Sequence, residues 1–243
     1  MLNDIGTVIW KEWKELVARS TRTRSETLKT IAVAAVILGI VVWRASHIIS
    51  NPGALIVPSF ALIQLLAGIM ADSFAGERER HTLETLLASR LSDLAILIGK
   101  IAAGVLLVWG LMLFATGLAV LASAIRPDGS PASLSLGNIV AILAIYFLLC
   151  LAMSCAAAIV SVRAPTVRQA IQTLTWSFMI LFFIGVFAIA RIPPQWKTTL
   201  MRVFMGENLV RTELIAAAIL SGLILFLFGA ARLRFQRARL ILD

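Results

Sequence analysis

The sequence predicts an all-α membrane protein with six transmembrane helices, and three observations lead to this fold class. Sixty per cent of the 243 residues are hydrophobic and 14% are charged, whereas a soluble domain of this size is usually about 45–50% apolar. Uncharged apolar runs recur along the chain, each close to the roughly twenty residues that a helix needs to cross a bilayer. Basic residues flank these runs. We therefore expect a single transmembrane domain over residues 1–243, without a soluble second domain.

Residues 1–29 are predicted to form an amphipathic helix at the membrane surface. Trp10 and Trp13 suit the headgroup region, where an indole keeps its N–H hydrated. Such a helix lies along the membrane with its apolar face inward. The apolar stripe comprises Ile5, Val8, Ile9, Trp13, Leu16 and Val17, and the hydrated face comprises Asp4, Lys11, Glu12, Lys14, Glu15 and Arg19.

The apolar runs place six spans within residues 30–231. Asn51-Pro52-Gly53 and the segment 126–131 are clear turn signals between spans. Gln64 lies in the middle of the second span and needs a partner on another helix or in water. Ser92 and Asp93 are expected to cap the start of the third span. The spans are predicted at residues 30–49, 54–74, 94–125, 138–162, 170–190 and 213–231, followed by a basic tail at 232–243.

The distribution of positive charge predicts the orientation of the chain. Sixteen of the 22 Lys and Arg residues fall in the two termini and in the connections on the same side, and six fall on the other side. The excess of positive charge marks the cytoplasmic side, so both termini are expected there. The net charge of +9 is therefore explained by topology and by anionic lipid, and no nucleic-acid partner is expected.

Residues 71–100 hold the densest charge cluster between two apolar runs, and they predict an amphipathic cytosolic helix from Gly76 to Ala88. Negative charge at its start, from Glu77 and Glu79, would be favoured by the helix macrodipole. The segment is either a solvated linker between two spans or a docking helix for a soluble partner. Its apolar stripe is Leu83, Leu86, Leu87, Leu91 and Leu94, and its hydrated face is Glu77, Arg80, His81 and Glu84.

These residues resemble the signature of the ABC-2 permease family. The resemblance rests on Glu77-Arg78-Glu79, Thr82-Leu83-Glu84, Leu86-Leu87-Ala88, Ser92 and Gly99-Lys100, with Arg90 where the family usually has proline. It implies the six-span membrane subunit of an exporter in the plasma (inner) membrane. That subunit would pair with a second copy or a similar subunit and work with a separate ABC ATPase. It also implies short re-entrant helices within residues 191–212 on the outer side. The residues then expected to couple to the ATPase are Glu77, Arg78, Glu79, Arg80, Thr82 and Glu84.

Motifs for several other chemistries do not occur in the sequence. The chain has no G-x-x-x-x-G-K-[ST], no H-E-x-x-H and no G-x-S-x-G, so we expect neither nucleotide nor metal nor cofactor bound by this chain. ATP and Mg are expected on the partner ATPase. Two alternatives to a permease subunit stay open. One is a membrane anchor or scaffold for a soluble ATPase machine without cargo of its own, and the other is an intramembrane hydrolase.

Overall fold

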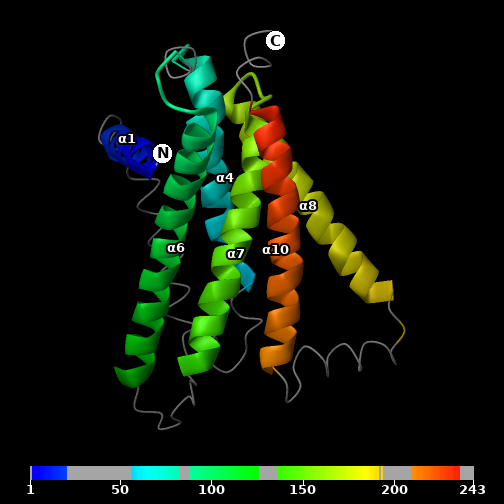
Figure 1. The fold of residues 1–243 in the computed structure, drawn as a ribbon. Coiled ribbons are helices and arrows are strands. Elements are labelled where there is room, and N and C mark those ends of the chain that lie inside the picture. Colours follow the sequence, from blue (N-terminus) through cyan, green and yellow to red (C-terminus); the bar gives the residue numbers. More distant parts are fainter. Residues whose placement is uncertain are drawn as a thin grey trace.

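The computed structural model describes residues 2–20, 56–82, 88–125, 136–191, 193 and 209–235. Within these residues the chain is helical and contains no strand (Figure 1). The predicted first span at 30–49 and Leu83 to Leu87 lie outside the described residues. So does most of the predicted outer segment 191–212, of which residues 191, 193 and 209–212 are described. The described helices are α1 (Leu2–Ser20), α4 (Ile56–Glu79), α6 (Asp93–Ile125), α7 (Leu136–Ser161), α8 (Val167–Arg191) and α10 (Leu209–Arg234).

Helix α7 is the centre of the bundle and packs against α4, α6, α8 and α10. Helix α4 also contacts α6 and α8. Helix α1 lies beside α6 at the end of the bundle that also holds the C-terminal end of α10, and α8 leans away from α10 along its length (Figure 1). The amphipathic helix predicted for residues 1–29 is therefore present over Leu2–Ser20, and it docks on one end of the bundle; residues 21–29 lie outside the described residues.

Four of the predicted spans coincide with long apolar helices. Among the described residues, four helices are long and apolar enough to cross a membrane, over Asp93–Leu118, Ile139–Ser161, Val167–Gly185 and Leu214–Arg234. They correspond to predicted spans three to six. The second predicted span falls on α4, whose Pro58 lies in the first turn, where a missing N–H costs no helical hydrogen bond. The chain is thus a multi-pass membrane protein.

Hydrogen bonds between α4 and its neighbours explain the polar residues inside these helices. Gln64 Oε1 accepts a hydrogen bond from Thr175 Oγ1 of α8 at 3.2 Å, so the predicted need for a partner is met by another helix. Ser161 at the end of α7 is fully buried. Its hydroxyl donates to Ala71 O at 3.1 Å and accepts from Ala75 N at 3.2 Å. Small residues at this crossing let α4 and α7 approach closely.

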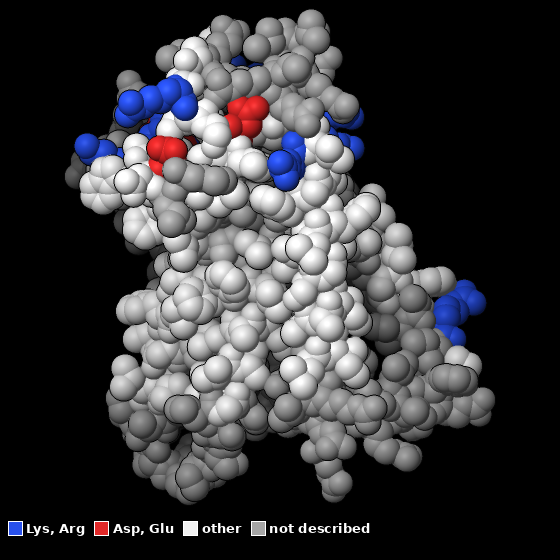
Figure 2. Space-filling view, in the orientation of Figure 1, with Lys and Arg blue, Asp and Glu red and all other residues white. Residues whose placement is uncertain are grey.

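Most charged side chains on the visible face gather at the end of the bundle that holds α1. A further basic group lies at the right edge of the view, and the middle of the face is free of charge (Figure 2). The start of α6 lies at this charged end. Ser92 caps it as predicted, because Ala95 N–H donates to Ser92 Oγ at 3.3 Å. The candidate functional site lies at the same end, where α4 finishes.

Candidate functional site

Helix α4 ends in a hydrogen-bonded stop that forms the first part of the site. Thr82 N–H donates to Glu77 O at 2.9 Å and His81 N–H donates to Arg78 O at 3.0 Å. These two bonds form a Schellman motif, in which a residue just after the end of the helix adopts the left-handed backbone conformation. That residue is His81, whose φ is 55°. We call residues Glu77–Thr82 the signature turn.

This stop corrects the prediction of a continuous cytosolic helix from Gly76 to Ala88. Residues Gly76 to Glu79 are the last turn of α4, and residues 88–92 are not helical. Glu77 and Glu79 therefore lie at a helix C-terminus, where the macrodipole disfavours negative charge. Their stabilisation has to come from other parts of the chain.

Glu77 is buried, with 2% of its surface exposed, so the prediction that it lies on a hydrated face is wrong. Its Oε1 accepts a hydrogen bond from Lys11 Nζ of α1. Its Oε2 lies 3.0 Å from Lys100 Nζ of α6, an ion-pair contact without hydrogen-bond alignment. A buried carboxylate is tolerated only when positive charge compensates it, and here two ammonium groups do so.

Lys100 is the centre of this arrangement and is 1% exposed. Its Nζ donates to Glu12 Oε1 at 2.8 Å, to Ser73 O at 2.7 Å and to Ser73 Oγ at 3.2 Å. These three bonds use the three protons of the ammonium. Ser73 Oγ then donates to Glu12 Oε2 at 2.9 Å. The buried ion cluster thus joins α1, α4 and α6, and it consists of Lys11, Glu12, Ser73, Glu77 and Lys100.

The cluster perturbs the ionisation of the two α1 residues. Burial by itself would raise the pKa of Glu12, but the charge of Lys100 and its hydrogen bond outweigh burial, so the pKa is lowered from 4.5. Burial by itself would lower the pKa of Lys11, but the hydrogen bond and charge of Glu77 outweigh it, so the pKa is raised from 10.5. Both groups are therefore charged at neutral pH. Two carboxylates and two ammonium groups balance inside the cluster.

Gly99 explains how α1 comes close enough to α6 for these contacts. A Cβ atom at this position would lie 2.6 Å from Val8 Cβ of α1, closer than side chains tolerate. Trp13 Nε1 of α1 also donates to Ala103 O of α6, at 3.3 Å. The Gly99-Lys100 pair thus provides a close helix crossing and, at the next residue, the central charge of the ion cluster.

The outer side of the signature turn contacts α7 and α8. Arg78 Nη1 donates to Val162 O, just after the end of α7, at 3.3 Å. Val167 N–H, at the start of α8, donates to Glu79 Oε2 at 3.2 Å. A cation at a helix C-terminus and a carboxylate at a helix N-terminus are the favourable arrangements with respect to the macrodipole. Arg78 and Glu79 therefore hold the connection between α7 and α8.

The remaining residues of the turn are exposed to solvent. Arg80 pairs with Asp72, eight residues earlier, with Nη1 and Oδ1 3.3 Å apart. Gly76 leaves room for this pair, since a Cβ there would lie 2.5 Å from Asp72 Oδ1. Thr82 Oγ1 donates to Glu77 O at 3.2 Å and fastens the end of the turn. An exposed Glu79, Arg80, His81 and Thr82 can contact a soluble partner directly.

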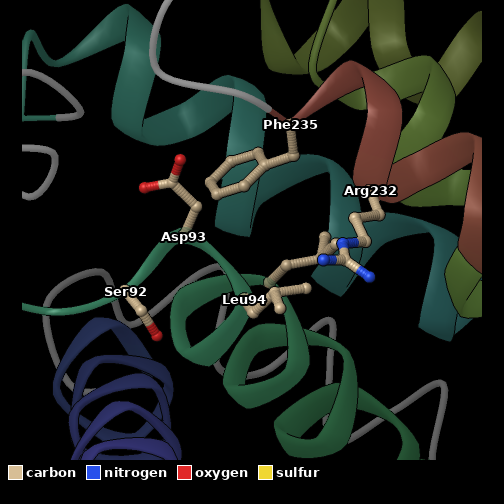
Figure 3. Close-up of a pocket in the computed structure, with 6 residues that line it drawn as sticks. Ser92, Asp93, Leu94, Arg232 and Phe235 are labelled. Atoms are coloured by element: carbon tan, nitrogen blue, oxygen red, sulfur yellow. The ribbon is translucent and has the colours of Figure 1, made fainter.

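A pocket of about 310 Å³ lies beside the site, between the start of α6 and the end of α10 (Figure 3). Phe235 forms one wall and packs edge to face on Phe74 of α4, with ring centroids 5.7 Å apart. None of the predicted coupling residues lines this pocket. Its lining residues are Ser92, Asp93, Leu94, Leu97, Arg232 and Phe235.

The structure brings five of the six predicted coupling residues into one turn, and Glu84 lies outside the described residues. It divides the five into an inward-facing member, Glu77, and residues at the surface. Sequence reasoning gave no role to Ser73 and placed Glu12 on the hydrated face. A signal for the cluster was present in Lys100, because a lysine beside an apolar run requires carboxylate partners when it is buried.

Comparison with known families identifies the family to which the chain belongs. The model of the ABC-2 type transporter family matches residues 3–207, which is most of the chain. This protein therefore belongs to the ABC-2 type transporter family, a membrane component of transport systems. Comparison with curated proteins finds no match.

Proposed function

We propose that this chain is the membrane-spanning permease subunit of an ATP-driven exporter, and that the signature turn couples it to a separate ATPase. One observation carries the proposal: consecutive residues of the turn bind different helices. Glu77 binds α1 and α6, Arg78 binds the end of α7 and Glu79 binds the start of α8. A displacement of the turn would therefore be transmitted to four helices besides α4.

The exposed and the buried residues of the turn would have different roles in coupling. Glu79, Arg80, His81 and Thr82 are exposed and would meet the ATPase. Glu77 is buried and would connect the turn to the ion cluster. ATP and Mg would be held by the ATPase, whose closure would push on the turn. Such a rigid-body movement is a common way to convert a local event into a global change.

We further propose that two permease chains assemble with two ATPases in the plasma membrane, with both termini in the cytoplasm. The excess of basic residues supports this orientation, because it puts the signature turn on the side where ATP is available. Mass measurement of the detergent-purified complex should give two membrane chains and two ATPases. A one-to-one complex that still transports would contradict the assembly.

The coupling proposal is tested by reversing charge at the turn. The chain is purified together with an ABC ATPase that binds it, and Glu79→Arg is compared with the wild type. Removing one partner of a desolvated charge pair at an interface costs about 2–5 kcal/mol, so ATPase association should fall by more than about tenfold. ATP hydrolysis stimulated by the membrane chain should fall with it.

Lys14→Glu is the matched control, because Lys14 is an exposed cation on α1 outside the turn. It should leave association unchanged. Equal association for Glu79→Arg, Lys14→Glu and the wild type would refute coupling through this turn. A flux assay in proteoliposomes then separates the exporter from the scaffold, because a scaffold binds the ATPase without moving any cargo.

A further inference from the structure

The pocket between the start of α6 and the end of α10 lies where two candidate spans end. The apolar segment of α6 begins at Asp93, and that of α10 finishes at Arg234. Asp93 and Arg232 both line the pocket, so it lies at the polar edge of two spans, the level at which lipid headgroups meet the hydrocarbon. The pocket shares no lining residue with the signature turn and is therefore a separate feature.

The pocket is open because the two helices that border it do not pack along each other. Helices α6 and α10 each pack on α7, and in the described part of the chain no extended packing joins them. They run on either side of α7 (Figure 1). The space between their ends at this membrane surface is therefore available to a lipid.

The pocket carries opposite charges on its two sides. Asp93 of α6 and Arg232 of α10 lie across from each other, with the Phe235 ring and Leu94 between them (Figure 3). No carboxylate of the described residues pairs with the Arg232 guanidinium. Each charge suits the macrodipole of its own helix, since Asp93 is in the first turn of α6 and Arg232 in the last turn of α10. The macrodipoles do not explain why both charges border one pocket.

We propose that the pocket binds one molecule of phosphatidylethanolamine from the adjacent leaflet. Arg232 binds the phosphate, because a guanidinium presents its donors in a fork that matches phosphate oxygens. Asp93 accepts hydrogen bonds from the ammonium, and a carboxylate has acceptor sites for several partners at once. Leu94 and Phe235 contact the glycerol region between them. The lipid thus bridges α6 and α10 where the helices do not pack on each other.

The size and the charges of the pocket select this headgroup. Its volume of about 310 Å³ lies at the lower end of the roughly 300–1,000 Å³ of small-molecule sites, so a headgroup fits while the acyl chains stay in the bilayer. A phosphatidylglycerol head has no ammonium and would bring its negative charge towards Asp93. A choline head is cationic but has no N–H to donate. The inference depends on the membrane and not on the exporter function.

Native mass spectrometry of the full-length chain, purified in detergent without the ATPase, tests the site. Phosphatidylethanolamine, phosphatidylcholine and phosphatidylglycerol with identical acyl chains are added singly, and the Kd of the first bound lipid is measured. Phosphatidylethanolamine should bind at least about fivefold more tightly than either of the others, because it alone donates hydrogen bonds to a charged acceptor. It should also raise the melting temperature more than phosphatidylcholine does, since a ligand of the folded chain stabilises it.

Two variants separate the two sides of the pocket. Asp93→Asn should lower the affinity for phosphatidylethanolamine towards that for phosphatidylcholine. Binding of phosphatidylcholine should stay unchanged, which also shows that this variant is folded. Arg232→Gln should weaken the binding of both lipids by roughly tenfold, because both carry the phosphate. Arg234→Gln is the matched control, since Arg234 is an exposed arginine of the same helix end that does not line the pocket. It should bind all three lipids as the wild type does.

Three results would overturn the proposal. The first is phosphatidylglycerol binding as tightly as phosphatidylethanolamine, because the basic end of α10 would then attract any anionic lipid. The second is equal affinity of the wild type for phosphatidylethanolamine and phosphatidylcholine. The third is an equal effect of Arg232→Gln and Arg234→Gln. None of them bears on coupling, which the Glu79→Arg experiment tests separately.

Discussion

Glu77 and Glu79 are two residues apart in the signature turn but occupy opposite environments. Glu77 faces the interior and is compensated by Lys11 and Lys100. Glu79 faces outward, and its carboxylate accepts the first N–H of α8. The inner side of the turn is therefore a buried ion cluster, and the outer side is a set of exposed contacts at helix ends.

The difference teaches that one charged motif serves two physical purposes. Buried charges are costly to leave unpaired, so the inner side fixes the relative positions of α1, α4 and α6. Exposed charges contribute little to stability, so the outer side is free to exchange its contacts for those of a partner. Variants on the two sides should therefore differ in the size and kind of their effects.

The largest effect is expected from Lys100→Met, which removes the central cation but keeps a long apolar side chain. Glu12 and Glu77 would then be buried without their main counter-charge. Breaking a buried ion pair by removing one partner costs about 3–5 kcal/mol. We expect a marked fall in the thermal stability of the detergent-purified chain, measured by fluorescence-detected size exclusion.

A second variant sharpens this result. The triple change Lys100→Met, Glu12→Gln and Glu77→Gln removes the buried charges together and should recover much of the lost stability. Lys11, the cation that remains, is partly exposed and still pairs with Glu15 at 3.2 Å. If Lys100→Met alone is as stable as the wild type, the cluster does not hold α1 against the bundle.

A smaller effect is expected from Gly99→Ala, where the added methyl group meets Val8 Cβ at 2.6 Å. Overpacking of a close contact costs about 1–3 kcal/mol. Gly110→Ala in the same helix is the control, since nothing lies within 4 Å of its Cβ. There the change should be neutral or stabilising by about 0.4–1 kcal/mol. Equal melting temperatures for the two variants would show that α1 does not depend on close packing at Gly99.

Much of the fold was predictable because a membrane span is marked by the hydropathy of about twenty consecutive residues. Predicted spans three to six match α6, α7, α8 and α10, and the cap at Ser92 is confirmed. These features depend on local composition and on hydrogen bonds between neighbouring residues. The positions of these spans and of the cap therefore do not depend on tertiary contacts.

The interior of the site was not predictable in this way. Glu12 and Lys100 are 88 residues apart, and helical periodicity places a carboxylate on the hydrated face by default. The end of α4 was also missed, because a Schellman motif usually has glycine at the left-handed position and here has His81. A run of charges therefore appeared to continue as a helix where the chain in fact turns.

The effect of Glu79→Gln on the isolated chain should be smaller still. The carboxamide keeps an oxygen for Val167 N–H and loses only the interaction of charge with the macrodipole, worth about 0.3–1 kcal/mol at an exposed site. Thermal stability should therefore change little, and far less than in Lys100→Met. A loss as large as that of Lys100→Met would erase the distinction between the two sides of the turn.

The smallest effect is expected from acidification between about pH 8 and about pH 5, and its sign follows from Glu12. A carboxyl group whose pKa is lowered in the folded protein stabilises the fold above its unfolded pKa, and this stabilisation is lost as pH falls through the folded pKa. Because the pKa of Glu12 lies below 4.5, the Glu12–Lys100 contact should persist throughout this range. For Lys11, whose pKa is raised above 10.5, the corresponding loss occurs only in strong alkali. The difference in melting temperature between wild type and Glu12→Gln should thus stay constant down to about pH 5 and shrink at lower pH as Glu12 becomes protonated. A difference that already shrinks near neutral pH would mean that Lys100 does not stabilise the charged form of Glu12.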